Sequence, residues 1–499
     1  MASKIGGPND PSHIAKDGYG KLSAQQAFSR FAGRIGAYAF GNALQRVGAF
    51  VLLPLYLSYL SPEEYGLLAL TSLLPVVIPP LFSLGLPNAI ERYYPDWHNE
   101  GIVSGNLGVI WLIVTGASLV LTLVLDHFGR ILLTTFITQV PFDPYLRWGI
   151  WWSFFSGLVT CPLFLLRIKE QSWGFVGASL LSFSLGIGLT LWAVVSGRGV
   201  IGILQMQTVS AAVVALVLSQ WYWTQAAITL HPAAIAKACR FALPLVPSAL
   251  LEIFATRADR FFLDKWVALP EIGFYALANQ VGQVVKFFYD SVKPAWFPFY
   301  IRVARERSDA SIFLGRIATL YVAALGAVAI TVFLMAPTLL MWLSRNAAYS
   351  SALPLIPILV VAYFFQGLAP LGTAAVLVAE RTLWQPPLQL VQVLAVIGAN
   401  LALTQHFGAK GAAWSLVITY GVLATMYLTI GQQVHPLSIE RARIAMVLSF
   451  LAIASIVLML WPGEISAVSR LVLSLVLNSG ILATVLWGRN GWRKSYQVS

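Results

Sequence analysis

Charged side chains are scarce in this sequence: Lys, Arg, Asp and Glu make up 10% of its 499 residues, whereas apolar residues make up 58%. Apolar runs of about 20 residues recur from end to end, the length that a helix needs to cross a bilayer. Lipid offers no hydrogen-bond partner to open backbone, so such runs form helices or a closed barrel. They lack the strict alternation of a barrel strand. The sequence therefore predicts an all-α integral membrane protein.

Residues that carry covalent or metal chemistry are also few. Cys161 and Cys239 are the only cysteines, so no disulfide framework is expected, and the six histidines show no metal-ligand spacing. A phosphate-binding loop of the Walker type is absent, which excludes ATP hydrolysis by this chain. A G-x-S-x-G motif is absent too, and no connecting loop is long enough to hold a catalytic domain. We therefore predict that the protein is not an enzyme and binds neither a metal nor a cofactor.

The apolar runs predict about 14 transmembrane helices, with boundaries uncertain by a few residues. They lie at 36–57, 64–85, 104–126, 146–167, 174–195, 201–223, 242–263, 273–297, 313–339, 353–373, 384–405, 411–430, 443–461 and 466–487.

The positions of Lys and Arg predict the orientation. If the polar segment 1–35 is cytoplasmic, most of the 32 Lys and Arg residues fall on the cytoplasmic side, as the positive-inside rule requires. This segment has no short apolar core with a cleavage site, so it is not a signal peptide. The even number of spans places both termini in the cytoplasm. The net charge of +12 is then explained without a nucleic-acid partner.

A short turn occurs twice. "SPEEYGLLAL" begins at Ser61 and "LPEIGFYAL" begins at Leu269, so that Gly66 recurs 207 residues later as Gly273. The turns join spans one to two and seven to eight, which predicts two parallel six-helix lobes around a central cavity. The predicted parts are a cytoplasmic N-terminal segment (1–35), an N-lobe (36–232), a C-lobe (233–430), and an extra helical hairpin with a cytoplasmic tail (431–499).

The eighth predicted span carries a polar stripe. Its members are spaced by four, three, four and three residues, which places them on one helical face: Asn279, Gln283, Lys286, Asp290 and Lys293. A charge at the bilayer centre costs about 2.5–3.5 kcal/mol, so this face needs an aqueous or protein-lined environment. The alternative is internal pairing of Asp290 with the two lysines.

Two other spans carry candidate site residues. In the first span, Asn42, Gln45 and Arg46 form a second polar stripe, and Arg46 lies near the bilayer midplane. A cavity-facing position is favoured because lipid exposure of Arg would be costly. In the seventh span, Arg257 is a candidate for the same role, although an Asp-Arg pair with Asp259 near the helix end is also typical of a structural tie.

Several segments between residues 36 and 430 form a recognisable set, which includes "LPLYLSYLSPEEYGLLAL", "FSLGLPNAIERYY", "KPAWFPFYIRVA" and "GANLALTQHFGAKGAAWSLVITYGV". In this order they resemble the oligosaccharide flippases of the multidrug/oligosaccharidyl-lipid/polysaccharide exporter superfamily. It implies a V-shaped central cavity and movement of a polyprenyl-diphosphate-linked oligosaccharide from the cytoplasmic to the periplasmic leaflet. The implied location is the bacterial inner membrane. The implied partners are this lipid-linked oligosaccharide, membrane lipid, a polysaccharide polymerase and chain-length or export proteins.

The resemblance assigns roles to the candidate residues. Arg46 in one lobe and Lys286 in the other would hold the diphosphate across the cleft, since Arg binds phosphate in a bidentate manner and Lys binds it as a point charge. A proton or sodium gradient would drive transport through Glu252 or Asp290. Glu252 is favoured because no cation lies three or four residues away, whereas the neighbouring lysines lower the pKa of Asp290.

Other functions stay open at this point. A lipid-linked peptidoglycan-precursor flippase would carry a similar diphosphate, and a drug exporter of the same superfamily would use an ion gradient. A membrane glycan polymerase or ligase is a different class, but it should have a large periplasmic loop. A non-transporting scaffold would leave the buried charge stripes unexplained.

Overall fold

The computed structural model describes residues 48, 50–343, 347–379, 384–438, 440–460 and 466–486. Helices make up almost all of these residues and no strand occurs among them, so the predicted all-α fold is confirmed. Within these ranges, nine helical stretches are long and apolar enough to cross a membrane. The eighth predicted span is helical but is not one of the nine, because its charged and amide side chains together lower its mean hydropathy.

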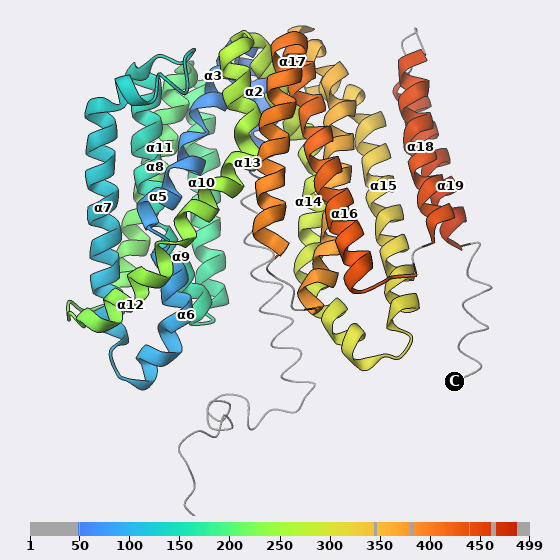
Figure 1. Ribbon diagram of the computed structural model, residues 1–499. Helices are drawn as coiled ribbons and strands as arrows, with labels where there is room; N and C mark the ends of the chain where they lie inside the picture. The colour runs from blue at the N-terminus through green and yellow to red at the C-terminus, as the bar shows by residue number, and fades with distance from the viewer. Residues whose placement is uncertain are drawn as a thin grey trace, which may run out of the picture.

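The first half of the chain builds a bundle of helices (Figure 1). Its elements are α2 (Leu53–Tyr59), α3 (Pro62–Thr71), α4 (Leu74–Val77), α5 (Pro79–Ser83), α6 (Leu86–Asn99), α7 (Val103–Leu132), η2 (Phe142–Leu146), α8 (Arg147–Leu158), α9 (Thr160–Ile168), α10 (Ser172–Val195) and α11 (Gly199–Trp223). The predicted second span is present as three short helices, α3 to α5, because prolines and a turn interrupt it.

The second half is built in the same way from longer helices. Its elements are α12 (Pro232–Ala242), α13 (Leu245–Trp266), α14 (Leu269–Glu306), α15 (Ala310–Leu343), η3 (Ala347–Leu355), α16 (Ile356–Val378), α17 (Gln385–Val434), α18 (Arg441–Leu460) and α19 (Ala467–Leu486). Gly408 breaks α17 with a positive φ of 58°, which a glycine adopts without strain. The two predicted spans 384–405 and 411–430 are the two arms of α17.

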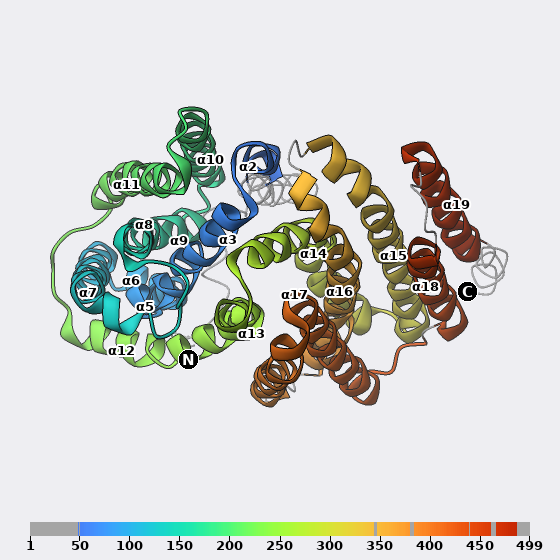
Figure 2. The ribbon, with the colours of Figure 1, turned by 90° about the horizontal axis from the view of Figure 1, so that it is seen from above.

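Seen from above, the helices form two groups that lie side by side (Figure 2). Helices α5 to α12 lie on one side and α14 to α17 on the other, with α3 and α13 at the junction. Helices α18 and α19 pack against α15 at the far edge. Two lobes with two additional C-terminal helices are therefore confirmed. Helix α12 packs against α6, so it is associated with the first group.

The repeated turn has a structural reason. Ser61 caps α3: its hydroxyl accepts a hydrogen bond from the Glu64 amide, and the Glu64 carboxylate accepts one from the Ser61 amide. This cap directs α3 against α14, where Gly66 and Gly273 meet. A Cβ on Gly66 would lie 2.2 Å from the Leu269 carbonyl oxygen, and a Cβ on Gly273 would lie 2.0 Å from the Pro62 oxygen. The two echoed glycines thus let the two halves touch backbone to backbone.

A second contact joins the halves at the same end of the molecule (Figure 1). The buried Asp264 carboxylate at the end of α13 accepts hydrogen bonds from the Thr138 amide (2.5 Å), the Thr138 hydroxyl (2.9 Å) and the Gln139 amide (3.1 Å). The Gln139 side chain donates to the Val267 carbonyl at 2.7 Å. The loop after α7 is therefore bound to the end of α13 by hydrogen bonds, although 126 residues separate Thr138 from Asp264.

We expect Asp264→Ala to lower the free energy of unfolding by about 1–3 kcal/mol, because it leaves the partly buried donors of this loop without their charged acceptor. The measurement is thermal unfolding of the purified protein in detergent. Asp309→Ala is the control, since Asp309 pairs with Arg307 at an exposed site, where ion pairs contribute little. Equal melting temperatures for the two variants would contradict the role of Asp264.

Candidate functional site

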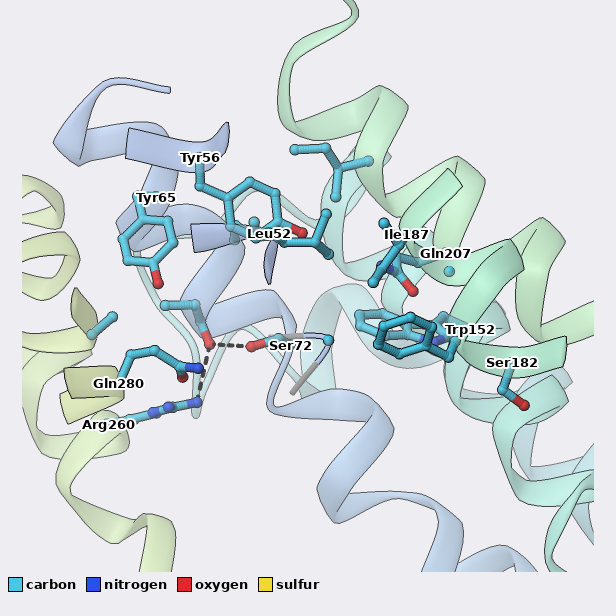
Figure 3. Close-up of a pocket in the computed structure, with 17 residues that line it drawn as sticks. Leu52, Tyr56, Tyr65, Ser72, Trp152, Ser182, Ile187, Gln207, Arg260 and Gln280 are labelled. Atoms are coloured by element: carbon cyan, nitrogen blue, oxygen red, sulfur yellow. Dashed lines mark hydrogen bonds between the residues drawn. The ribbon is translucent and has the colours of Figure 1, made fainter. Parts of the chain in front are cut away.

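A cavity of about 410 Å³ lies where the two halves meet (Figure 3). Its walls come from α2, α3, α8, α10 and α11 in the first half and from α13 and α14 in the second. The labelled lining residues are Leu52, Tyr56, Tyr65, Ser72, Trp152, Ser182, Ile187, Gln207, Arg260 and Gln280. The cavity is therefore completed only when both halves are folded together, as a site between two lobes requires.

Arg260 is the one charged side chain among the described residues that line this cavity. It extends from α13 towards the backbone of α3, where its Nη1 lies 3.5 Å from the Ala69 carbonyl oxygen. Within the described part of the chain, no carboxylate lies at salt-bridge distance from Arg260. Most of its hydrogen-bonding capacity is thus available to an anion in the cavity.

The rest of the lining combines apolar surface with neutral hydrogen-bonding groups. The Ser72 hydroxyl donates to the Ala69 carbonyl at 2.8 Å, and the Gln207 amide donates to the Thr190 hydroxyl at 2.8 Å. Gln280 projects into the cavity from α14 (Figure 3). Such a wall suits a ligand that has one anionic group and several hydroxyl groups.

Buried polar contacts connect the helices around Arg260. The neighbouring Asp259 is 2% exposed and accepts a hydrogen bond from the Tyr275 hydroxyl, which ties α13 to α14. One turn further along α14, Asn279 accepts a hydrogen bond from the Tyr363 hydroxyl of α16 at 2.6 Å. Asn279 therefore faces the interior of the second half, where it joins two helices.

Three of the predicted stripe residues lie deeper along α14. Lys286 Nζ lies 2.9 Å from an Asp290 carboxylate oxygen and 3.3 Å from the Tyr289 hydroxyl. The alternative of internal pairing is thus present for these two residues. Tyr289 in turn donates to Gln366 of α16, so that the pair is connected to the second half. Lys293 is exposed, with Nζ 5.9 Å from the centre of the Phe297 ring.

The other predicted site residues are distributed over several surfaces. Gln283 is half-buried and, seven residues after Ala276, continues the face of α14 that lines the cavity. Arg257 is half-buried one turn before Arg260. Glu252 is exposed on α13 and interacts electrostatically with Tyr427 of α17. Asn42, Gln45 and Arg46 lie outside the described residues.

The sequence analysis did not include Arg260, Gln280, Tyr56, Tyr65 or Gln207 among the site residues. For Arg260 a signal was present, because it follows Arg257 by three residues and shares its helical face. For the neutral residues no signal was available, since each is an ordinary member of an apolar span.

Comparisons with known proteins agree with this architecture. The sequence profile of the family described as "Polysaccharide biosynthesis protein" matches residues 59–343, more than half of the chain. No curated protein matches the sequence. Among solved structures, the lipid II flippase MurJ in an inward closed conformation has a TM-score of 0.72 at 11% identity, covering 91% of this chain and 99% of its own.

Two multidrug transporter structures are also similar. An inward-facing MATE transporter of the MOP superfamily has a TM-score of 0.59 at 16% identity, covering 81% of this chain and 96% of its own. The Vibrio cholerae MATE transporter VcmN has a TM-score of 0.54 at 15% identity, with coverages of 81% and 96%. The fold is that of these flippase and transporter structures. The family match shows that the chain belongs to the polysaccharide biosynthesis protein family.

Proposed function

We propose that this protein flips polyprenyl-diphosphate-linked oligosaccharide units from the cytoplasmic to the periplasmic leaflet for the synthesis of cell-surface polysaccharide. The observation that carries the proposal is Arg260 in the cavity between the halves, with no carboxylate at salt-bridge distance in the described chain. A diphosphate group inside a bilayer needs fixed cations, and a guanidinium can bind it in a bidentate manner. Alternating access would come from rocking of one half against the other.

Several predicted residues remain candidates around this centre. Gln283 lies on the cavity face of α14 and can reach the sugar units with its amide. Lys286 forms a salt bridge with Asp290. Arg260 is therefore the stronger candidate in the second half for binding the diphosphate. Arg46 would be the corresponding cation of the first half. Arg257, Lys293, Asn279, Asn42 and Gln45 complete the proposed binding set.

The proposal requires a defined orientation in the inner membrane, with both termini in the cytoplasm. We expect Glu63→Cys, in the first turn of α3, to react with a membrane-impermeant thiol reagent added outside intact cells. Arg305→Cys, near the opposite end of the molecule, should react only after the membrane is opened. Labelling of Arg305→Cys in intact cells would contradict the predicted orientation and indicate the opposite one. Glu464, the other predicted outer position, lies outside the described residues.

Coupling to an ion gradient is part of the proposal, with Glu252 as the carboxylate that carries the proton. We expect Glu252→Gln to abolish the acceleration of transport by an imposed pH gradient in proteoliposomes. Asp290→Asn, which breaks the pair with Lys286, should retain that acceleration. If transport by Glu252→Gln still depends fully on the pH gradient, Glu252 is not the proton carrier. If transport by the wild type responds to neither a proton nor a sodium gradient, coupling itself is refuted.

The function is tested by deleting the gene and extracting the lipid-linked intermediates. Accumulation of a polyprenyl-diphosphate-linked oligosaccharide on the cytoplasmic side, relieved by the wild-type gene, supports the proposal. Accumulation of a lipid-linked peptidoglycan precursor instead would indicate that the protein is a peptidoglycan-precursor flippase. An unchanged set of intermediates would contradict both. A drug exporter for organic cations is disfavoured, because the charge in the described cavity wall is positive.

A further inference from the structure

An apolar groove of about 370 Å³ lies beside the cavity, between α2 and α10. Its walls include Leu55 and Tyr59 from α2, Val51 just before α2, and Leu191 from α10. Leu52 and Ile187 line both the groove and the cavity, and they lie close together in the cavity wall in Figure 3. The groove and the cavity therefore adjoin at these two side chains.

The groove has few polar groups that could bind a ligand. Of its described lining residues only Ser58 and Tyr59 have polar side chains, and none is charged. The Ser58 hydroxyl donates to the Pro54 carbonyl at 2.8 Å, so its hydrogen is already used. Val51, Tyr59 and Leu191 are between 45% and 56% exposed. The groove therefore matches a hydrocarbon chain better than a headgroup or a sugar.

The two neighbouring sites together fit an amphipathic ligand. We propose that the groove between α2 and α10 binds the polyprenyl chain of the lipid carrier, while its diphosphate and sugars occupy the cavity with Arg260. This inference rests on the proposed function and adds the place of the lipid chain. With the chain in the groove, the polar head can enter the cavity while the hydrocarbon stays out of water.

Another apolar surface lies on α19, where Leu471 and Leu475 are exposed. Helix α19 packs on α15 and α18, and its described residues line neither the cavity nor the groove. A chain bound there would have no direct path to Arg260. The shared lining residues Leu52 and Ile187 therefore favour the groove between α2 and α10.

Photo-crosslinking tests the assignment. Benzoylphenylalanine is placed at Leu191 in the groove, at Leu475 on α19, and at Leu112, a similarly exposed leucine on α7. The probe is a tritiated polyprenyl diphosphate without sugar, added to the full-length protein in nanodiscs. We expect about tenfold more labelling at position 191 than at 112. Excess unlabelled probe should remove this labelling, whereas added phosphatidylglycerol should not.

Each other outcome overturns the assignment in a distinct way. Equal labelling at 191 and 112 with normal probe binding would show that the groove is ordinary lipid-facing surface. Dominant labelling at 475 would place the chain on α19. Competition by phosphatidylglycerol would make the groove a site for bilayer lipid. Absence of probe binding by the wild type would overturn the proposed function and the groove with it.

A substitution in the groove distinguishes binding of the polyprenyl chain from binding of the diphosphate headgroup. We expect Leu191→Arg to weaken probe binding about tenfold, because a charge in the groove opposes the hydrocarbon. Binding of a water-soluble diphosphate ester with a short alkyl chain should be unchanged in Leu191→Arg. Equal weakening for both compounds would show a general disturbance of the fold and contradict the groove as the chain site.

Discussion

Replacement of Arg260 by Ala should abolish transport and weaken binding of a polyprenyl diphosphate about a hundredfold, while the protein still inserts into the membrane. The side chain lines the cavity between the two halves and has no carboxylate at salt-bridge distance in the described chain. Loss of a cation that pairs with a buried anion costs a few kcal/mol, which corresponds to this change in affinity. The measurement is equilibrium binding of the labelled lipid to purified protein.

Two further variants make the result specific. Arg260→Lys keeps the charge but loses the bidentate geometry, so about tenfold weaker binding is expected. Arg240→Ala removes an exposed cation on α12 and should bind the lipid like the wild type. Wild-type affinity in Arg260→Ala would exclude this residue as the diphosphate ligand, and an equal loss in Arg240→Ala would point to a nonspecific charge effect.

Replacement of Gly66 by Val should force the two halves apart at the α3–α14 contact. Its Cβ would lie 2.2 Å from the Leu269 carbonyl oxygen, a backbone atom that cannot turn away. Overpacking of this kind costs about 1–3 kcal/mol, enough to change the ratio of closed to open molecules by about five- to 150-fold. We expect transport to fail because this end can no longer close.

The opening can be measured with a cysteine at Ser72, which lines the cavity. In a background without Cys161 and Cys239, Ser72→Cys should react slowly with an impermeant thiol reagent from outside. Adding Gly66→Val should make it react faster. Gly188→Val on α10 is the matched control, because no atom lies within 4 Å of the added Cβ. Unchanged labelling together with normal transport in Gly66→Val would refute closure at this contact.

The sequence predicted the helices well for a physical reason. A backbone in lipid must satisfy its own hydrogen bonds, so each long apolar run has one available structure. The elements outside the predicted spans, α6 and α12, have polar faces that conceal them from a search for apolar runs. The stripe on α14 was also predictable from spacing. Its pairing of Lys286 with Asp290 needs only one turn of one helix.

The sequence by itself determined the class of protein and most of its helical spans, and its repeated turn predicted two lobes. The tertiary structure decided which polar residues share a site. Arg260 and Gln280 meet Ser72 and Gln207 only because α3 and α14 cross at two glycines, and Asn279 turns instead towards Tyr363. Helical periodicity fixes the face on which a side chain lies, but what that face meets depends on packing between segments about two hundred residues apart.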